Sequence, residues 1–387
     1  MEMVRKLPIA WLQISNQKVR LSVALAGVAF AVILVSMQLG FRGSVYESAV
    51  RYHRQLSYDL VMVSPKTPYI GYPESFSRRR LYQALAAQGV EQVTPVYIRQ
   101  AYWRNPWTFD SRLIFILGFD PAHDALDVPG VRDNLELLKL PDIVLFDALS
   151  RPEYGPVGDQ FVETGPIEVQ VNNREITVAG LFALGTSFGL DGSLVTSDLN
   201  YLRIFSDRAP GYIELGLIHL ADGASPLMVR AALRNALEPD VEILTKSEFI
   251  ARERNYWATT TPVGYVFGFG AIMGLIVGCV VVYQILFADV SEHLAEYATL
   301  KAVGYRNRDL SLVILREATL LAFLGYIPGL AITIPLYRIT SEATRLPLDM
   351  TWARALAVLV FTIGMCAIAG FMALRQVRSA DPADVFA

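Results

Sequence analysis

The longest apolar stretch of the chain runs from Pro262 to Phe287, and it contains no charged residue. A helix needs about 20 mostly apolar residues to cross the hydrocarbon core of a bilayer. This stretch is longer than that, so it predicts a membrane-spanning helix over residues 261–287. We expect the helix to belong to one continuous rod, which begins at Thr245 and continues into the polar segment 288–309.

Three more segments are long and apolar enough to span a membrane, at residues 21–41, 310–337 and 352–374. Pro328 and Pro335 lie in the second of these segments and remove backbone hydrogen bonds, so we expect that helix to be bent or interrupted. The mean hydropathy of +0.36 and the 18% of charged residues indicate a membrane part joined to a sizeable water-soluble part.

Residues 42–260 are too polar to span a membrane and too long for a loop, which predicts one or two soluble domains. Strand-like and helix-like segments are mixed in this region, as in an α+β fold. Apolar and polar residues alternate on both sides of Asn172-Asn173, which predicts a β-hairpin. We expect residues 105–210 to form an inserted, strand-rich subdomain.

Thr245 and Glu248 have the spacing of a capping box, so they predict the start of a stalk helix over residues 245–260. The predicted fold is therefore an α-helical membrane protein with four transmembrane helices. A large α+β domain is inserted between the first and the second of them.

Lys and Arg in the short flanking segments predict the topology. They occur in residues 1–20, 288–309 and 375–387, whereas the turn 338–351 is nearly balanced in charge. The positive-inside rule then places both termini and the 288–309 segment in the cytoplasm and the large domain outside. We expect residues 1–20 to form an amphipathic helix on the inner membrane surface.

Gly270, Gly274 and Gly278 recur at every fourth position of the 261–287 span. This spacing predicts a flat seam against which another helix packs closely. The alternative is the general frequency of glycine in membrane helices. Arg316 and Glu317 predict an inner-interface pair whose side chains reach water, with a buried coupling pair as the alternative.

The sequence holds no GxxxxGK[ST], HExxH or paired-cysteine motif, so we expect a chain that is not itself catalytic and binds no metal or cofactor. A net charge of −3 gives no basic excess for nucleic acid. Arg78–Arg80 predict a solvated helix start or a docking patch for an acidic partner. The aromatic residues between Tyr97 and Phe109 predict domain core or a partner surface.

Three short segments resemble the MacB/FtsX-like family of ABC transporter permeases, also called mechanotransmission or type VII transporters. They are Leu7–Leu12 before the first span, Glu296–Tyr305 after the second, and Asp381–Val385 at the end of the chain. Their order around four spans and one large outer domain fits the family along essentially the whole chain. Chains of this kind are multi-pass proteins of the bacterial inner membrane with a periplasmic domain.

The resemblance implies that the 288–309 segment contacts a separate ABC ATPase, which binds ATP and Mg. The residues assigned to this ATPase-coupling segment are Glu292, His293, Glu296, Leu300, Lys301, Val303, Gly304 and Tyr305. The family often has Arg at the position of His293. A neutral or partly charged imidazole makes a weaker contact with an acidic groove.

The chain most closely resembles the DevC-type permeases of cyanobacteria. That resemblance implies a homodimer in a tripartite efflux system, with a periplasmic adaptor (membrane fusion) protein, a TolC-like outer-membrane duct, and a lipid or other hydrophobic cargo such as a glycolipid. One alternative is a lipoprotein-releasing permease. Another is an FtsX-like signalling protein that controls a cell-wall hydrolase.

Overall fold

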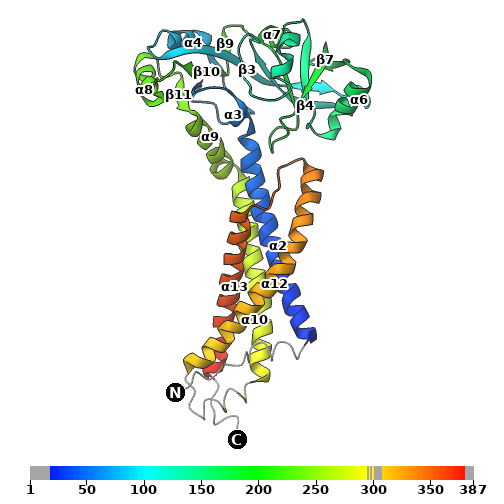
Figure 1. Ribbon diagram of the computed structural model, residues 1–387, viewed down its shortest axis with the longest axis vertical. Helices are drawn as coiled ribbons and strands as arrows, with labels where there is room; N and C mark the ends of the chain where they lie inside the picture. The colour runs from blue at the N-terminus through cyan, green and yellow to red at the C-terminus, as the bar shows by residue number, and fades with distance from the viewer. Residues whose placement is uncertain (1–17, 294–295, 297–298, 300–306, 380–387) are drawn as a thin grey trace. The chain divides into compact units, whose positions relative to one another are not determined.

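A computed structural model describes residues 18–293, 296, 299 and 307–379 of the chain (Figure 1). The surface helix is expected at residues 1–20; its residues 1–17 lie outside the described part, as do residues 380–387, and its residues 18–20 begin the first described helix. The chain divides into two compact units. Residues 1–44, 263–343 and 348–387 belong to the first unit, and residues 45–262 and 344–347 to the second.

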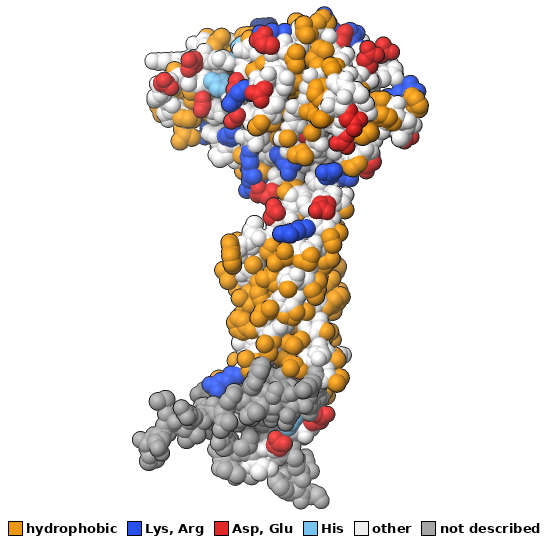
Figure 2. Space-filling view, turned by 45° about the vertical axis from the view of Figure 1, so that its right-hand side comes forward, with side chains coloured by type: hydrophobic (Ala, Val, Ile, Leu, Met, Phe, Trp, Pro, Cys, Tyr) orange, Lys and Arg blue, Asp and Glu red, His pale blue; other side chains and the backbone are white. Residues whose placement is uncertain are grey.

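The first unit is helical. Within the described residues, four helices are long and apolar enough to cross a membrane, at Leu21–Ala49, Pro262–Glu292, Ile314–Thr344 and Trp352–Leu374. They belong to α2 (Lys18–Ala49), α10 (Pro262–Glu292), α12 (Asn307–Thr344) and α13 (Trp352–Ser379). On the face that Figure 2 shows, most side chains of the helical unit are apolar, as contact with the hydrocarbon core of a bilayer requires. The predicted fold class is confirmed.

The helices differ from the expected spans at three places. Helix α2 continues past residue 41 to Ala49, because the residues after the apolar run do not break a helix. Of the expected bend or interruption, the interruption is absent, because α12 is a single α-helix through Pro328 and Pro335. Membrane helices tolerate proline where neighbouring groups satisfy the freed carbonyls. The same helix extends to Thr344, which shortens the expected 338–351 turn.

The second unit is built on a nine-stranded sheet in the order β11-β1-β10-β3-β4-β8-β5-β7-β6. Its strands are β1 (Leu60–Val63), β3 (Val90–Arg104), β4 (Ser111–Phe119), β5 (Ile143–Asp147), β6 (Ile167–Val171), β7 (Arg174–Phe182), β8 (Ser193–Ser197), β10 (Leu215–Leu220) and β11 (Glu242–Thr245). Strands β2 (Phe76–Ser77) and β9 (Tyr212–Ile213) form a small second sheet.

Short helices surround the sheet. They are α3 (Arg51–Gln55), α4 (Arg78–Leu85), α5 (Leu135–Leu138), α6 (Val157–Thr164), α7 (Asp198–Ile204), α8 (Pro226–Ala236) and α9 (Lys246–Asn255), with 3-10 turns at Arg132–Asn134 and Pro152–Tyr154. One apolar core lies on each face of the sheet. Alternation along β3 sends Tyr97 and Trp103 into one core and Val96 and Ile98 into the other, because successive side chains of a strand point to opposite faces.

Strand β3 joins the two halves of the sheet. It pairs with β10 over Val90–Val96, with β4 over Val96–Arg104, and with β6 at Trp103 and Arg104. The strands of the expected subdomain at residues 105–210, β4 to β8, therefore belong to the same sheet as β1, β3, β10 and β11. The predicted hairpin is confirmed: β6 pairs with β7, and Asn172 and Asn173 both have positive φ, as a type I′ turn requires.

The rod predicted from Thr245 to Phe287 is broken in the structure. Helix α9 ends at Asn255, a π-helical turn (η3) follows at Tyr256–Thr260, and Thr261 is extended with φ −100° and ψ 152°. Helix α10 begins at the next residue, Pro262. Proline disfavours helical backbone at the residue before it and suits the first position of a new helix. The 245–260 stalk and the 261–287 span are thus two helices with an extended residue between them.

The predicted capping box is confirmed at the start of α9. The Thr245 hydroxyl accepts from the Glu248 backbone N–H, and the Glu248 carboxylate accepts from the Thr245 N–H. The Arg230 guanidinium and the Thr245 N–H stabilise the Glu248 carboxylate and lower its pKa to about 2. A lowered folded-state pKa contributes stability above the ordinary value near 4.5, and that stability is lost as the pH falls toward 2.

We expect Thr245→Ala to destabilise α9 by about 1 kcal/mol, the usual cost of losing an N-cap. The measurement is hydrogen-exchange protection of α9 amides in the full chain. In the parent protein this protection should decline between pH 5 and pH 2, and Glu248→Gln should flatten the decline. Ser225→Ala is the control, because the Ser225 side chain makes no capping bond to α8. Equal effects of both alanine variants would contradict this role of Thr245.

Candidate functional site

The predicted glycine seam faces α2. A Cβ added at Gly270 would meet the Gln38 side chain at 2.5 Å, and one at Gly274 would meet Val35 at 3.2 Å. A Cβ at Gly278 would lie 2.5 Å from the Ala31 Cβ and 2.2 Å from the Met365 sulfur of α13. Only glycine allows α10 to come this close to its neighbours.

Helix α2 is also packed closely by other glycine contacts. Its own Gly27 lies against Val281 of α10, and Gly325 and Gly329 of α12 lie against Val28 and Val32. The seam is thus filled by a helix of the same chain, and it does not by itself supply a surface for a second copy. Helix α2 is the helix around which α10 and α12 are arranged in the first unit.

Three residues of the predicted coupling segment, Glu292, His293 and Glu296, are among the described residues. Glu292 is the last residue of α10 and is exposed, as is Glu296. His293 turns back onto the helix, with its Nδ1 2.9 Å from the Asp289 carbonyl oxygen. The other five predicted residues, Leu300, Lys301, Val303, Gly304 and Tyr305, lie outside the described residues.

Arg316 and Glu317 of α12 are in different environments. Arg316 is exposed, whereas Glu317 is buried with 4% of its surface accessible. Neighbouring residues on a helix point about 100° apart, so the two side chains do not share one face. The exposure of Arg316 fits the hypothesis of a side chain that reaches water, whereas the burial of Glu317 fits the alternative of a buried side chain.

The chain enters or leaves the second unit at three places: in the last turns of α2, at the start of α10, and at residues 344–347, where α12 ends and the chain turns to α13. One loop contacts all three. We call this loop, residues 183–192 between β7 and β8, the junction loop. It has no regular secondary structure of its own apart from an isolated bridge.

Each connection reaches the junction loop through a different residue. Arg51 follows α2, and its guanidinium donates to the carbonyl oxygens of Leu184 at 3.0 Å and Thr186 at 3.2 Å. The Thr186 hydroxyl donates to the Arg345 carbonyl oxygen at 3.0 Å. Trp257 of the π-helical turn lies edge-on to Phe188 of the loop, with ring centroids 5.7 Å apart.

Asp147 at the end of β5 holds the junction loop in place. Its carboxylate is fully buried and accepts from the backbone N–H groups of Leu184, Gly185 and Leu149 at 3.1, 2.7 and 3.0 Å. The Ser193 hydroxyl donates to it at 3.2 Å. Burial raises the pKa of Asp147, and these hydrogen bonds oppose the rise by favouring the charged form.

A buried His–Glu contact joins the arriving and leaving segments directly. His53 of α3 lies 3.4 Å from the Glu253 carboxylate of α9. Glu253 also accepts from the Ile70 N–H and the Trp257 indole N–H, both at 3.0 Å. The buried carboxylate is therefore supplied with hydrogen-bond donors, as burial of a charge requires.

One motif match lies within the junction loop. Residues 185–189 read Gly-Thr-Ser-Phe-Gly, which fits the GxSxG pattern of a nucleophile elbow. That elbow exposes its serine at a strand-to-helix turn. Here the loop leads into strand β8, and Ser187 is 4% exposed with its backbone paired to Leu190. The match therefore lacks the context that the chemistry needs.

The remaining predicted patches are partly structural. Arg80 pairs with Asp240 and Glu238, and Arg78 donates to the Tyr82 hydroxyl, so two of the three arginines serve the fold. Among the aromatic residues, Tyr97 and Trp103 are core, whereas Tyr102 and Phe109 are 62% and 66% exposed. In the described part of the chain, no group of three or more His, Cys, Asp or Glu residues could hold a metal ion.

Comparison with known proteins finds two family matches. The MacB-like periplasmic core domain matches residues 21–236, which is more than half of the chain, and the FtsX-like permease C-terminal domain matches residues 268–382. Together they cover the first span, most of the soluble domain and most of the last three spans, and they leave residues 237–267 unmatched.

Curated relatives are similar over part of their length. The pyoverdine export ATP-binding/permease protein PvdT of Pseudomonas putida is 26% identical over 60% of this chain and 35% of its own length. The macrolide export ATP-binding/permease protein MacB of Bradyrhizobium diazoefficiens is 35% identical over 21% of this chain and 13% of its own length.

The solved periplasmic region of MacB from Actinobacillus actinomycetemcomitans aligns with 52% of this chain and 95% of that chain, at 12% identity and a TM-score of 0.37.

The longer family match covers most of the second unit together with the first span, and the shorter one covers most of the other three spans. The chain belongs to the MacB/FtsX-like family of ABC transporter permeases.

Proposed function

We propose that this chain is the permease subunit of an ABC-type tripartite efflux system. It transmits the ATP-driven motion of a separate ATPase subunit to its soluble domain, which exports a lipid or other hydrophobic cargo. ATP and Mg are bound by the ATPase. The observation that carries the proposal is the junction loop, because all three connections between the spans and the soluble domain contact it.

The broken stalk changes how such motion would travel. Helix α2 continues without a break to Ala49, two residues before Arg51. Helix α10 is separated from α9 by the π-helical turn and the extended Thr261. We therefore assign the rigid path to α2 and Arg51, and a hinge to Thr261. Movement of α2 would displace the Leu184 and Thr186 carbonyls through the Arg51 guanidinium.

The proposed setting is the bacterial inner membrane, with both termini and the 288–309 segment in the cytoplasm and the large domain in the periplasm. The cations of the short flanking segments support this orientation. The proposed assembly is a homodimer with a periplasmic adaptor and a TolC-like outer-membrane duct, like the DevC-type systems. Pyoverdine is the second candidate cargo, because one relative is a pyoverdine export ATP-binding/permease protein.

The test reverses charge in the coupling segment. We expect Glu296→Lys combined with Lys301→Glu to abolish ATPase coupling and transport while membrane insertion is retained. Glu342→Lys is the matched control, since Glu342 is an exposed acid in the last turn of α12. ATP hydrolysis and transport are measured with the ATPase and permease co-reconstituted. Unchanged transport in the double variant would refute the coupling role.

Affinity capture of the full chain separates the alternatives. An adaptor and a duct in the captured complex support the efflux proposal. A lipoprotein carrier would instead indicate a lipoprotein-releasing permease. A cell-wall hydrolase without an adaptor would indicate an FtsX-like signalling protein.

A further inference from the structure

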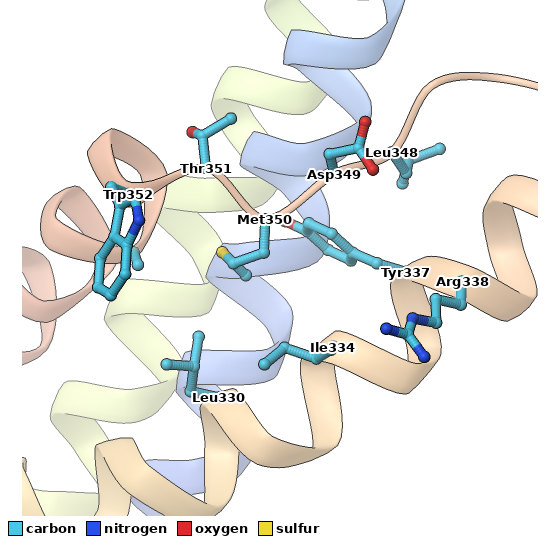
Figure 3. A pocket seen from close by; sticks show the side chains of 10 residues that line it. Leu330, Ile334, Tyr337, Arg338, Leu348, Asp349, Met350, Thr351 and Trp352 are labelled. Carbon is cyan, nitrogen blue, oxygen red and sulfur yellow. The ribbon is translucent and has the colours of Figure 1, made fainter.

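A pocket of about 380 Å³ lies in the first unit, between the end of α12 and the start of α13 (Figure 3). Its volume is within the range of sites that bind small molecules, about 300–1,000 Å³. Leu330 and Ile334 of α12, Met350 of the connecting turn and Ala355 of α13 supply apolar walls. The pocket therefore offers a surface suited to a hydrocarbon chain.

The pocket has a polar rim on one side. Arg338 of α12 is exposed at this rim, and its guanidinium extends toward Ile334, whereas the Asp349 carboxylate points away from it (Figure 3). Within the described residues, no carboxylate forms an ion pair with Arg338. The second nearby cation, Arg354, donates to the Asp349 carbonyl oxygen and lies over the Tyr337 ring. Arg338 is thus the cation at this rim that no carboxylate of the described residues pairs with.

Trp352 marks the depth of the pocket in a bilayer. It is the first residue of α13, lines the pocket and is 92% exposed. Tryptophan collects at the level of lipid headgroups, where its ring contacts hydrocarbon and its N–H contacts water. An apolar floor below a basic rim at this depth matches a molecule with an acyl chain and an anionic head.

We propose that this pocket binds one anionic phospholipid of the surrounding bilayer. One acyl chain lies along Leu330, Ile334 and Met350, and the phosphate is held by Arg338. The inference goes beyond the proposed export function, because it needs only that α12 and α13 span a membrane. A zwitterionic lipid has the same chains and phosphate but adds a cation that Arg338 repels. Preference for the anionic headgroup is therefore the signature of this site.

The experiment uses the full chain in nanodiscs of phosphatidylcholine. These contain a small fraction of phosphatidylglycerol or, in a parallel set, phosphatidylcholine with a photoactivatable group in one acyl chain. Crosslinks are mapped by mass spectrometry. We expect the phosphatidylglycerol probe to label the peptides that contain Leu330–Ile334 and Met350 about five-fold more than the phosphatidylcholine probe, since one cation near a charged lipid surface contributes about that factor.

Two variants separate the head from the chain. Arg338→Gln should remove the preference for phosphatidylglycerol but keep residual labelling by both probes. Ile334→Trp should fill the floor and reduce labelling by both. Arg345→Gln is the charge-matched control, because the Arg345 side chain is exposed and lies outside the pocket lining. Labelling that is equal for both headgroups in the parent protein, or unchanged by Arg338→Gln, would overturn the proposal.

Discussion

Gly278→Val is expected to destabilise the helical unit by about 3 kcal/mol, at the upper end of the usual cost of overpacking. The added Cβ would overlap the Ala31 Cβ and the Met365 sulfur, which lie 2.5 and 2.2 Å from its position. The methionine chain can turn aside, because its three side-chain torsions are flexible. The Ala31 Cβ is fixed to the α2 backbone, so α2 and α10 must move apart.

Gly268→Val is the matched control for this prediction. It lies on the same helix, and a Cβ added there meets nothing within 4 Å. Because glycine is the poorer helix former, this variant should be neutral or slightly stabilising. The unfolding temperature of each variant is measured by heating the purified protein in detergent and monitoring the loss of folded protein by size-exclusion chromatography. If both variants unfold at the same temperature, the close α2–α10 contact does not determine stability.

The patterns that the sequence revealed correctly are local. Four apolar runs of bilayer length predict the spans, and a threonine three residues before a glutamate predicts the cap of α9. The Asn172-Asn173 hairpin follows from the preference of asparagine for positive φ. Each of these needs information from only a few neighbouring residues.

In the stalk, a local helix-breaking signal contradicts the longer apolar pattern that predicts one continuous helix. Thr261-Pro262 is a helix-breaking pair, because proline crowds the residue before it out of helical backbone. The continuous apolar and helix-forming pattern around it favoured one rod, and the structure instead ends one helix and starts another at this pair. The apolar run itself predicts only that α10 is long and apolar enough to span a membrane.

The junction loop could not be predicted, since its contacts join residues far apart in the chain. Arg51 and Leu184 are separated by 133 positions, and Thr186 and Arg345 by 159. Nothing local distinguishes these arginines from solvated ones. The one available hint was Asp147, a carboxylate placed directly at the end of the apolar strand Ile143–Phe146, where a charged residue needs buried donors.

Asp147→Ala is expected to cost more than about 3 kcal/mol in the second unit and to uncouple the spans from the soluble domain. The substitution leaves the buried N–H groups of Leu184 and Gly185 without an acceptor, and each such loss costs about 1–3 kcal/mol. Partial burial lowers the pKa of the Arg51 guanidinium, and the substitution also removes the Asp147 charge that opposes this lowering. The junction loop then loses the bonds that hold its conformation.

Asp147→Asn tests whether charge or shape is required. Its amide nitrogen would place a donor against either the Gly185 N–H or the Leu184 N–H, so one of these bonds is lost while the side-chain volume is kept. We expect Asp147→Asn to destabilise the second unit, but by less than Asp147→Ala does. Asp207→Ala is the control for loss of a carboxylate, because Asp207 forms an exposed pair with Arg99, and such pairs contribute at most about 1 kcal/mol.

Two measurements on the full chain distinguish a loss of stability from a loss of coupling. Hydrogen exchange over residues 183–192 reports the order of the junction loop, and ATP hydrolysis measured together with transport reports coupling. In Asp147→Asn we expect faster exchange in this loop and hydrolysis without transport, while the rest of the sheet remains protected. Thr186→Val should weaken only the contact with Arg345 and give a smaller defect. If Asp147→Asn exchanges faster in the loop but transports normally, the three connections act on the soluble domain by another route, and the path through Arg51 is wrong.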